Sequence, residues 1–157
     1  GRIGAFITKN KQVLDAAMKF AQARLSPPYF AQILGEAAVD LPDNYFDDIK
    51  AEYERRRNIL VERLNAMPGV FCPNPGGAFY AMAKLPIDDC DAFCQWLLER
   101  FEHNGATLML APATGFYSTP GLGLQEVRLA YVLNTDAIHA AMDCLEAALK
   151  VYPGRKN

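Results

Sequence analysis

One stretch of the sequence, Glu126–Leu133, alternates in side-chain character at every residue and constrains the fold more than any other. Val127, Leu129, Tyr131 and Leu133 fall on one face, while Arg128, Ala130 and Val132 fall on the other. A repeat of two residues predicts a β-strand. Any fold for this chain must therefore give the strand neighbours in a sheet and cover its apolar face.

The segments from about residue 41 onward alternate between helical and strand-like patterns. Helices are predicted over 49–64, from Asp88 or Asp89 to Phe101, and after an Asn134 cap; strands are predicted at 70–71, 78–82, 107–110 and 126–133. The order helix, strand, strand, helix, strand, strand, helix predicts an α+β fold. We expect a small α/β sandwich, with helices packed on one face of a sheet.

The first 40 residues do not fit into that sandwich. Arg2–Thr8 reads as a buried strand, and two helices follow over 12–23 and Tyr29–Val39, the second opened by Ser26 as N-cap. A strand and two helices cannot bury their own apolar faces, so residues 1–40 are interpreted as a strand-helix-helix remnant of a larger α/β domain. The polar break at 41–44 is the predicted domain boundary, which assigns 41–157 to the second domain.

Composition limits the class of protein. The net charge is -2 and the pI about 5.7, which argues against a nucleic-acid partner because phosphate contacts need a basic surface. No apolar run approaches the length of a membrane helix. Four cysteines could form disulfides, but the acidic, cytoplasmic-type composition favours free thiols. Cysteine and histidine are not spaced for a metal site.

Two arginines stand in apolar strands, and no complete catalytic motif accompanies them. Arg2 lies between glycines, and Arg128 interrupts the alternating strand. A buried arginine needs an anionic partner, so each could bind a ligand or form a structural ion pair. The run Arg55–Arg57 is interpreted as a solvated helix face.

Five segments, in order along the chain, resemble motifs of fold-type I (class I/II) aminotransferases. They are Gly1-Arg2-Ile3-Gly4, Ser26-Pro27-Pro28 with Gln32, Pro75–Tyr80, Ala111–Phe116 and Val127–Tyr131. Each motif is weak alone, but their order and spacing span nearly the whole chain. The usual Pro-Gly of the fourth motif is Pro-Ala here. The chain therefore resembles the C-terminal part of an aspartate-type aminotransferase.

The resemblance implies roles for individual residues. Arg2 would bind the phosphate of pyridoxal 5'-phosphate, and Arg128 would bind the α-carboxylate of the amino-acid substrate. Phe79 would lie near the substrate entrance. Arg24 precedes the interdomain segment and could read a substrate side-chain carboxylate across a dimer, although a solvated helix end is the simpler alternative.

The resemblance also places the Schiff-base lysine about eight residues before Arg2, upstream of Gly1. The chain would then hold no catalytic residue of its own and be inactive alone. The parent would be a cytoplasmic homodimer that transfers amino groups between an amino acid, taken to be aspartate, and a 2-oxo acid. A carbon–sulfur lyase, an alanine or aromatic aminotransferase, and a ligand-sensing domain of a transcription regulator share the scaffold and remain alternatives.

Overall fold

The computed structural model describes residues 2–156 and divides into two compact units, residues 1–46 and 47–157. The division falls a few residues beyond the break at 41–44, and the domain boundary at residue 40 stays a prediction. Each unit is described by itself.

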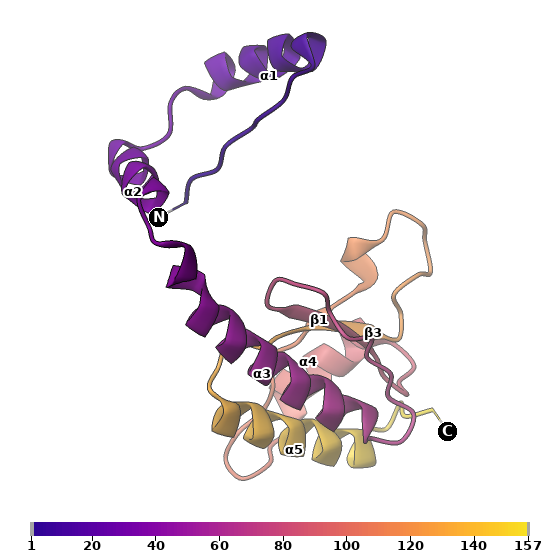
Figure 1. The fold of residues 1–157 in the computed structure, drawn as a ribbon. Coiled ribbons are helices and arrows are strands. Elements are labelled where there is room, and N and C mark those ends of the chain that lie inside the picture. The colour runs from indigo at the N-terminus through magenta and orange to yellow at the C-terminus, as the bar shows by residue number, and fades with distance from the viewer. Residues whose placement is uncertain (1, 157) are drawn as a thin grey trace. The chain divides into compact units, whose positions relative to one another are not determined.

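The first unit contains two helices, α1 (Lys11–Arg24) and α2 (Tyr29–Val39), and a 3-10 turn over Asp43–Phe46 (Figure 1). Asn10 caps α1, because its side chain accepts a hydrogen bond from the Val13 backbone N–H at 3.2 Å. The predicted cap of α2 is wrong: the N-cap residue is Pro28, which makes no side-chain cap bond, rather than Ser26.

The strand predicted over Arg2–Thr8 does not form, because no second strand in this unit offers backbone groups to pair with it. Ile3 instead packs toward α2, so that a side chain at Gly35 would meet Ile3 Cδ1 at 3.3 Å. Ala31 is the one buried apolar residue described in this unit, and large side chains such as Phe20 and Phe30 are 79% exposed. Residues 2–46 therefore form no apolar core among themselves.

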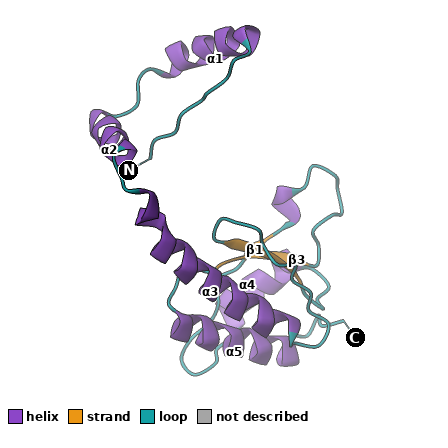
Figure 2. Ribbon diagram, viewed as in Figure 1, coloured by secondary structure: helices purple, strands orange, loops and turns teal. Residues whose placement is uncertain are grey.

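The second unit contains three long helices and a three-stranded antiparallel sheet (Figures 1 and 2). Its elements are α3 (Asp47–Asn65), β1 (Tyr80–Lys84), α4 (Cys90–Arg100), β2 (Ala111–Pro112), β3 (Glu126–Ala130) and α5 (Thr135–Val151). The strand order is β1-β3-β2. Asp89 and Asn134 cap α4 and α5 through side-chain oxygens, as predicted.

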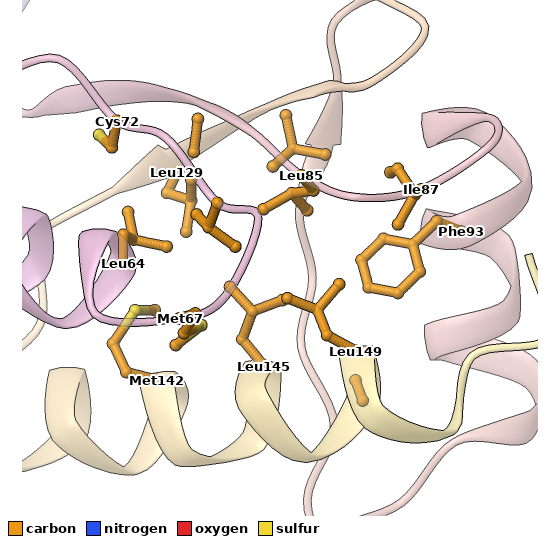
Figure 3. Packing of buried hydrophobic residues seen from close by; sticks show 14 of the residues in the cluster. Leu64, Met67, Cys72, Leu85, Ile87, Phe93, Leu129, Met142, Leu145 and Leu149 are labelled. Carbon is orange, nitrogen blue, oxygen red and sulfur yellow. The ribbon is translucent and has the colours of Figure 1, made fainter. Parts of the chain in front are cut away.

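One face of the sheet is buried against the helices. Ala81, Ala83, Val127 and Leu129 point inward and share a single core with residues of α3, α4 and α5. Figure 3 shows Leu64, Leu145 and Phe93 reaching that core from the three helices. The unit is thus an α+β sandwich, which confirms the predicted class, and the opposite face of the sheet is not covered by these helices.

The sheet is shorter than the sequence pattern predicted. β3 ends at Ala130, and Leu133 is 55% exposed although it continues the apolar face. Residues 107–110 form no strand, since no backbone–backbone hydrogen bond described for the chain involves them and Met109 is 83% exposed. The Thr107 hydroxyl instead donates to the Leu97 carbonyl at 2.6 Å. This segment is held by side chains rather than by a strand ladder.

All four cysteines are free and buried, which confirms the free-thiol interpretation. Burial raises the pKa of the Cys94 thiol to about 12, so that side chain is a neutral core residue.

Candidate functional site

Arg128 lies on the open face of the sheet, between two aromatic rings. Its guanidinium carbon is 4.4 Å from the centre of the Tyr80 ring and 4.8 Å from the centre of the Phe116 ring. β3 places it there because alternate residues of the strand, Val127 and Leu129, are buried on the helix side. Cation–π contacts of this kind restrain the guanidinium without using its N–H donors.

The donors of Arg128 are consequently available for an anion. Among residues 2–156, no carboxylate forms a salt bridge with Arg128, and no side-chain hydrogen bond involves it. The structural ion pair that the sequence left open is therefore not formed in the described part of the chain. A restrained guanidinium with free N–H groups suits a carboxylate, which it can grip with two parallel hydrogen bonds.

Tyr131 holds the turn before β1 in place. Its hydroxyl donates to the carbonyl of Ala78 at 3.0 Å, and the residue is 1% exposed. Ala78 has φ 59°, a left-handed conformation that costs energy for a residue with a Cβ. Arg57 donates to the Pro75 carbonyl at 3.3 Å at the other end of the turn. The turn is thus held in one conformation by two side chains.

Phe79 sits at this turn, next to the ring that contacts Arg128. The centres of the Phe79 and Tyr80 rings are 4.5 Å apart. Phe79 is 40% exposed and also lines a cavity of about 290 Å³ with Lys50, Tyr53 and Tyr131. The structure therefore brings Phe79 and Arg128 into one neighbourhood through Tyr80, which is compatible with a residue at the entrance of a site.

Arg2 and Arg24 line one cavity of the first unit, of about 790 Å³. The remaining lining residues are Ile3, Gly4, Phe6, Ala17, Phe20, Ala21, Leu25 and Pro27, so no carboxylate faces the two guanidinium groups. Neither arginine belongs to a salt bridge among the described residues. Two unpaired cations in a cavity without an acid fit a phosphate group. Arg24 is exposed at the end of α1 and also lines this cavity, so its role stays a prediction.

The arginine run on α3 is a solvated face only in part: Arg55 is 60% exposed, as the sequence predicted, but Arg56 and Arg57 are partly buried. The Arg56 side chain is only 18% exposed; it bonds Glu52 at 2.7 Å and donates to the Val132 carbonyl at 2.7 Å. Arg57 reaches the turn before β1. These two side chains join α3 to loops that flank the sheet, so they are structural braces.

Other kinds of site are not built by the described residues. Within 2–156, no three His, Cys, Asp or Glu side chains are grouped to hold a metal ion. No helix in that range is both long and apolar enough to cross a membrane.

The known proteins that resemble this chain are aminotransferases. No protein-family model matches the sequence. The chain is 28% identical over 153 residues to the aspartate aminotransferase of Pyrococcus horikoshii, covering 95% of this chain and 37% of that protein. It is 31% identical over 158 residues to the aspartate aminotransferase of Musicola paradisiaca, covering 96% and 36%. The structure of alanine aminotransferase from Pyrococcus furiosus superposes with a TM-score of 0.73 at 26% identity, covering 90% of this chain and 35% of that one.

The fold and these relatives support the identification of the chain as part of an aminotransferase. It belongs with the aspartate aminotransferase-like proteins and corresponds to a C-terminal fragment of one. The chain spans only about a third of the length of the curated relatives that it matches.

Sequence patterns alone assign no role to the two rings around Arg128. Tyr80 and Phe116 lie within the motif segments, and only an indirect pattern points to Tyr80. A period of two residues puts Tyr80 on the face opposite buried Ala81, where Arg128 also lies. Contact between them depends on the register of β1 and β3, in which Tyr80 pairs with Ala130 and Met82 with Arg128. A single sequence does not specify that register.

Proposed function

We propose that this chain supplies the substrate-carboxylate site and part of the cofactor-phosphate site of a pyridoxal-phosphate-dependent aminotransferase. The observation that carries the proposal is Arg128, restrained between two rings on the open face of the sheet and without a salt bridge to any residue of 2–156. The parent protein transfers an amino group between an amino acid and a 2-oxo acid.

In this proposal Arg128 binds the α-carboxylate of the amino acid through two parallel hydrogen bonds. Two bonds fix the rotation of the substrate as well as its position, and so determine which bond at the α-carbon is aligned for cleavage. Tyr80 and Phe116 keep the guanidinium plane in place while the substrate exchanges. Phe79 borders the route by which the substrate enters.

Arg2 holds the cofactor phosphate, and Arg24 lines the same cavity with a second positive charge. The permanent charge of a guanidinium suits phosphate at every physiological pH. Pyridoxal phosphate, when bound, supplies the electron sink for removal of the α-proton. If Arg24 reaches a substrate instead of the phosphate, a side-chain carboxylate is the group it would select.

Aspartate is the amino acid that we propose, since the two curated relatives described above are aspartate aminotransferases. The parent acts as a cytoplasmic homodimer in this proposal. The exposed apolar side chains of residues 2–46 are the surface that the rest of the large domain would cover. The boundary at residue 40 belongs to the same proposal.

The covalent lysine of the reaction is assigned to the parent, not to this chain. The seven lysines here are Lys9, Lys11, Lys19, Lys50, Lys84, Lys150 and Lys156, and none precedes Arg2. The 157-residue chain mixed with pyridoxal phosphate and then borohydride is expected to give no adduct at one defined lysine. A stoichiometric adduct at a single lysine would show that the assignment is wrong.

The activity is tested on the longer protein that contains this sequence. Aspartate, alanine, phenylalanine and cystathionine are each supplied with 2-oxoglutarate, and glutamate, ammonia and pyruvate are measured. Glutamate formation, highest with aspartate, supports the proposal. Release of ammonia and pyruvate from cystathionine indicates a carbon–sulfur lyase, and ligand binding without turnover indicates a sensor domain.

A further inference from the structure

The loop between β2 and β3, residues 113–123, is clipped to β3 at both ends. The Ala113 N–H donates to the Glu126 carbonyl at 3.1 Å, and the Glu126 N–H donates to the Gly123 carbonyl at 2.9 Å. Thr114 adds a hydroxyl bond to Asp91 at 2.6 Å. The loop is therefore anchored at its base, whereas residues 118–121 are exposed.

Two consecutive residues of this loop contact two alternate residues of β3. Phe116 lies against the Arg128 guanidinium, and the Tyr117 hydroxyl donates to the Glu126 carboxylate. Glu126 and Arg128 are two positions apart, so both side chains stand on the open face of the sheet. The tyrosine bond thus fixes the part of the loop that carries the phenylalanine.

Gly123 makes room for this arrangement. A Cβ at position 123 would lie 2.8 Å from Cδ2 of Tyr117, so a larger residue there would clash with the tyrosine ring. The φ of +80° at Gly123 also favours glycine. The Glu126 carboxylate, as acceptor of the hydroxyl proton, raises the pKa of Tyr117. The hydroxyl is therefore protonated and donating across the physiological range.

We propose that Tyr117 and Glu126 are positioning residues for Arg128: their hydrogen bond holds Phe116 on the guanidinium and so sets the direction in which Arg128 presents its N–H groups. The inference rests on the proposed function in one respect: the carboxylate that Arg128 would bind is the α-carboxylate of the amino-acid substrate. The geometry of the hydrogen bond itself does not rest on the proposed function.

Nearby charges leave the bond between Tyr117 and Glu126 intact. Lys84 pairs with Glu126 in the strand register, but no salt bridge between them occurs among the described residues. Arg128 likewise leaves the carboxylate to Tyr117. The carboxylate is therefore used to hold the loop rather than to neutralise the guanidinium, and Arg128 keeps its charge for a ligand.

The test is made on the ligand-free 157-residue chain by NMR. Relaxation of the Arg128 Nε–Hε group, assigned with Arg128→Lys, gives its order parameter. We expect a restrained side chain, near about 0.8, that falls below about 0.6 in both Tyr117→Phe and Glu126→Ala. The double variant is expected to be no more mobile than either single variant, because both remove one interaction.

Tyr152→Phe is the matched control. It removes another tyrosine–carboxylate bond, from Tyr152 to Asp88 at 2.9 Å, at a position away from the open face. It should leave the Arg128 order parameter unchanged. An unchanged value in Tyr117→Phe, in a chain whose backbone spectrum is otherwise intact, overturns the proposal, as does an equal loss of order in Tyr152→Phe.

A kinetic arm addresses the positioning role directly. In the longer protein, Tyr117→Phe is expected to raise KM for the amino acid about fivefold, with kcat within about twofold. An unchanged KM would refute positioning even if Arg128 loosened. If transamination itself is absent while the order parameters respond as expected, the proposed function fails and the contact between loop and arginine stands.

Discussion

The guanidinium of Arg128 lies over the ring of Tyr80, 4.4 Å from Cζ to the ring centre, with Phe116 4.8 Å away. These contacts restrain Arg128, which forms no salt bridge with the residues that the structure describes. A structural arginine would instead be neutralised by a carboxylate within the fold. A ligand-binding arginine and a structural arginine predict different losses in the free energy of unfolding when the charge is removed.

Replacing Arg128 by methionine should change the free energy of unfolding by about 1 kcal/mol or less, because only cation–π contacts at a partly exposed site are lost. Chemical denaturation in urea measures this change. A buried ion pair would respond differently, since removing one partner typically costs about 3–5 kcal/mol. A loss in that range would show that Arg128 is structural.

Tyr131→Phe should destabilise the second unit by about 1–2 kcal/mol. The hydroxyl is buried and its loss leaves the Ala78 carbonyl without its bond at 3.0 Å, in a turn whose φ of 59° already costs energy. Urea denaturation compares it with Tyr45→Phe, a substitution at a tyrosine that is 48% exposed. Equal effects of the two substitutions would contradict the role given to Tyr131.

Leu145→Ala should cost about 2–5 kcal/mol, because Leu145 is fully buried in the core shared by the sheet and α5. Leu133→Ala is the matched control and should cost less than about 0.5 kcal/mol, since Leu133 is 55% exposed. Thermal and urea unfolding both report the difference. A large cost at Leu133 would mean that its face is covered in solution.

The ion pair between Asp143 and Arg63 predicts how the stability of the fold changes at low pH. The hydrogen bond from Arg63, with Nη2 2.6 Å from Oδ1, holds the pKa of Asp143 below its ordinary value. Because its pKa is lower in the folded state, Asp143 stabilises the fold at pH values above its ordinary pKa. This stabilisation is lost as the pH falls through the pKa of the folded state. Asp143→Asn should therefore be less stable than the natural chain at neutral pH, with the difference shrinking below about pH 4. A difference independent of pH would exclude this origin.

The sequence predicted the α+β class and most helices because their periodicity is long and local. Asn134 and Asp89 could be assigned as caps because a cap depends on a few neighbouring residues. The strand over residues 2–8 failed for the opposite reason: its apolar pattern is real, but pairing needs a second strand that the first unit lacks. The prediction that the last strand continues to Leu133 was wrong because an alternating pattern does not show where the partner strand ends.

The residues of the candidate site differ in how clearly the sequence points to them. Arg2 and Arg128 stand out in the sequence as charges in apolar segments within recognisable motifs, although the segment around Arg2 forms no strand. Neither arginine has a salt bridge among the described residues. The rings around Arg128 depend on strand register and on the path of the 113–123 loop. Those are tertiary features that residue spacing does not encode.

The most direct test of the account is steady-state kinetics of Arg128→Lys in the longer protein. Lysine keeps the positive charge but cannot form two parallel bonds, so kcat/KM for the amino acid should fall by about 100-fold or more. Arg100→Lys, on an exposed helix position, is the control and should be unchanged. A kcat/KM for Arg128→Lys within about twofold of the natural protein would contradict the assignment of Arg128 as the carboxylate-binding residue.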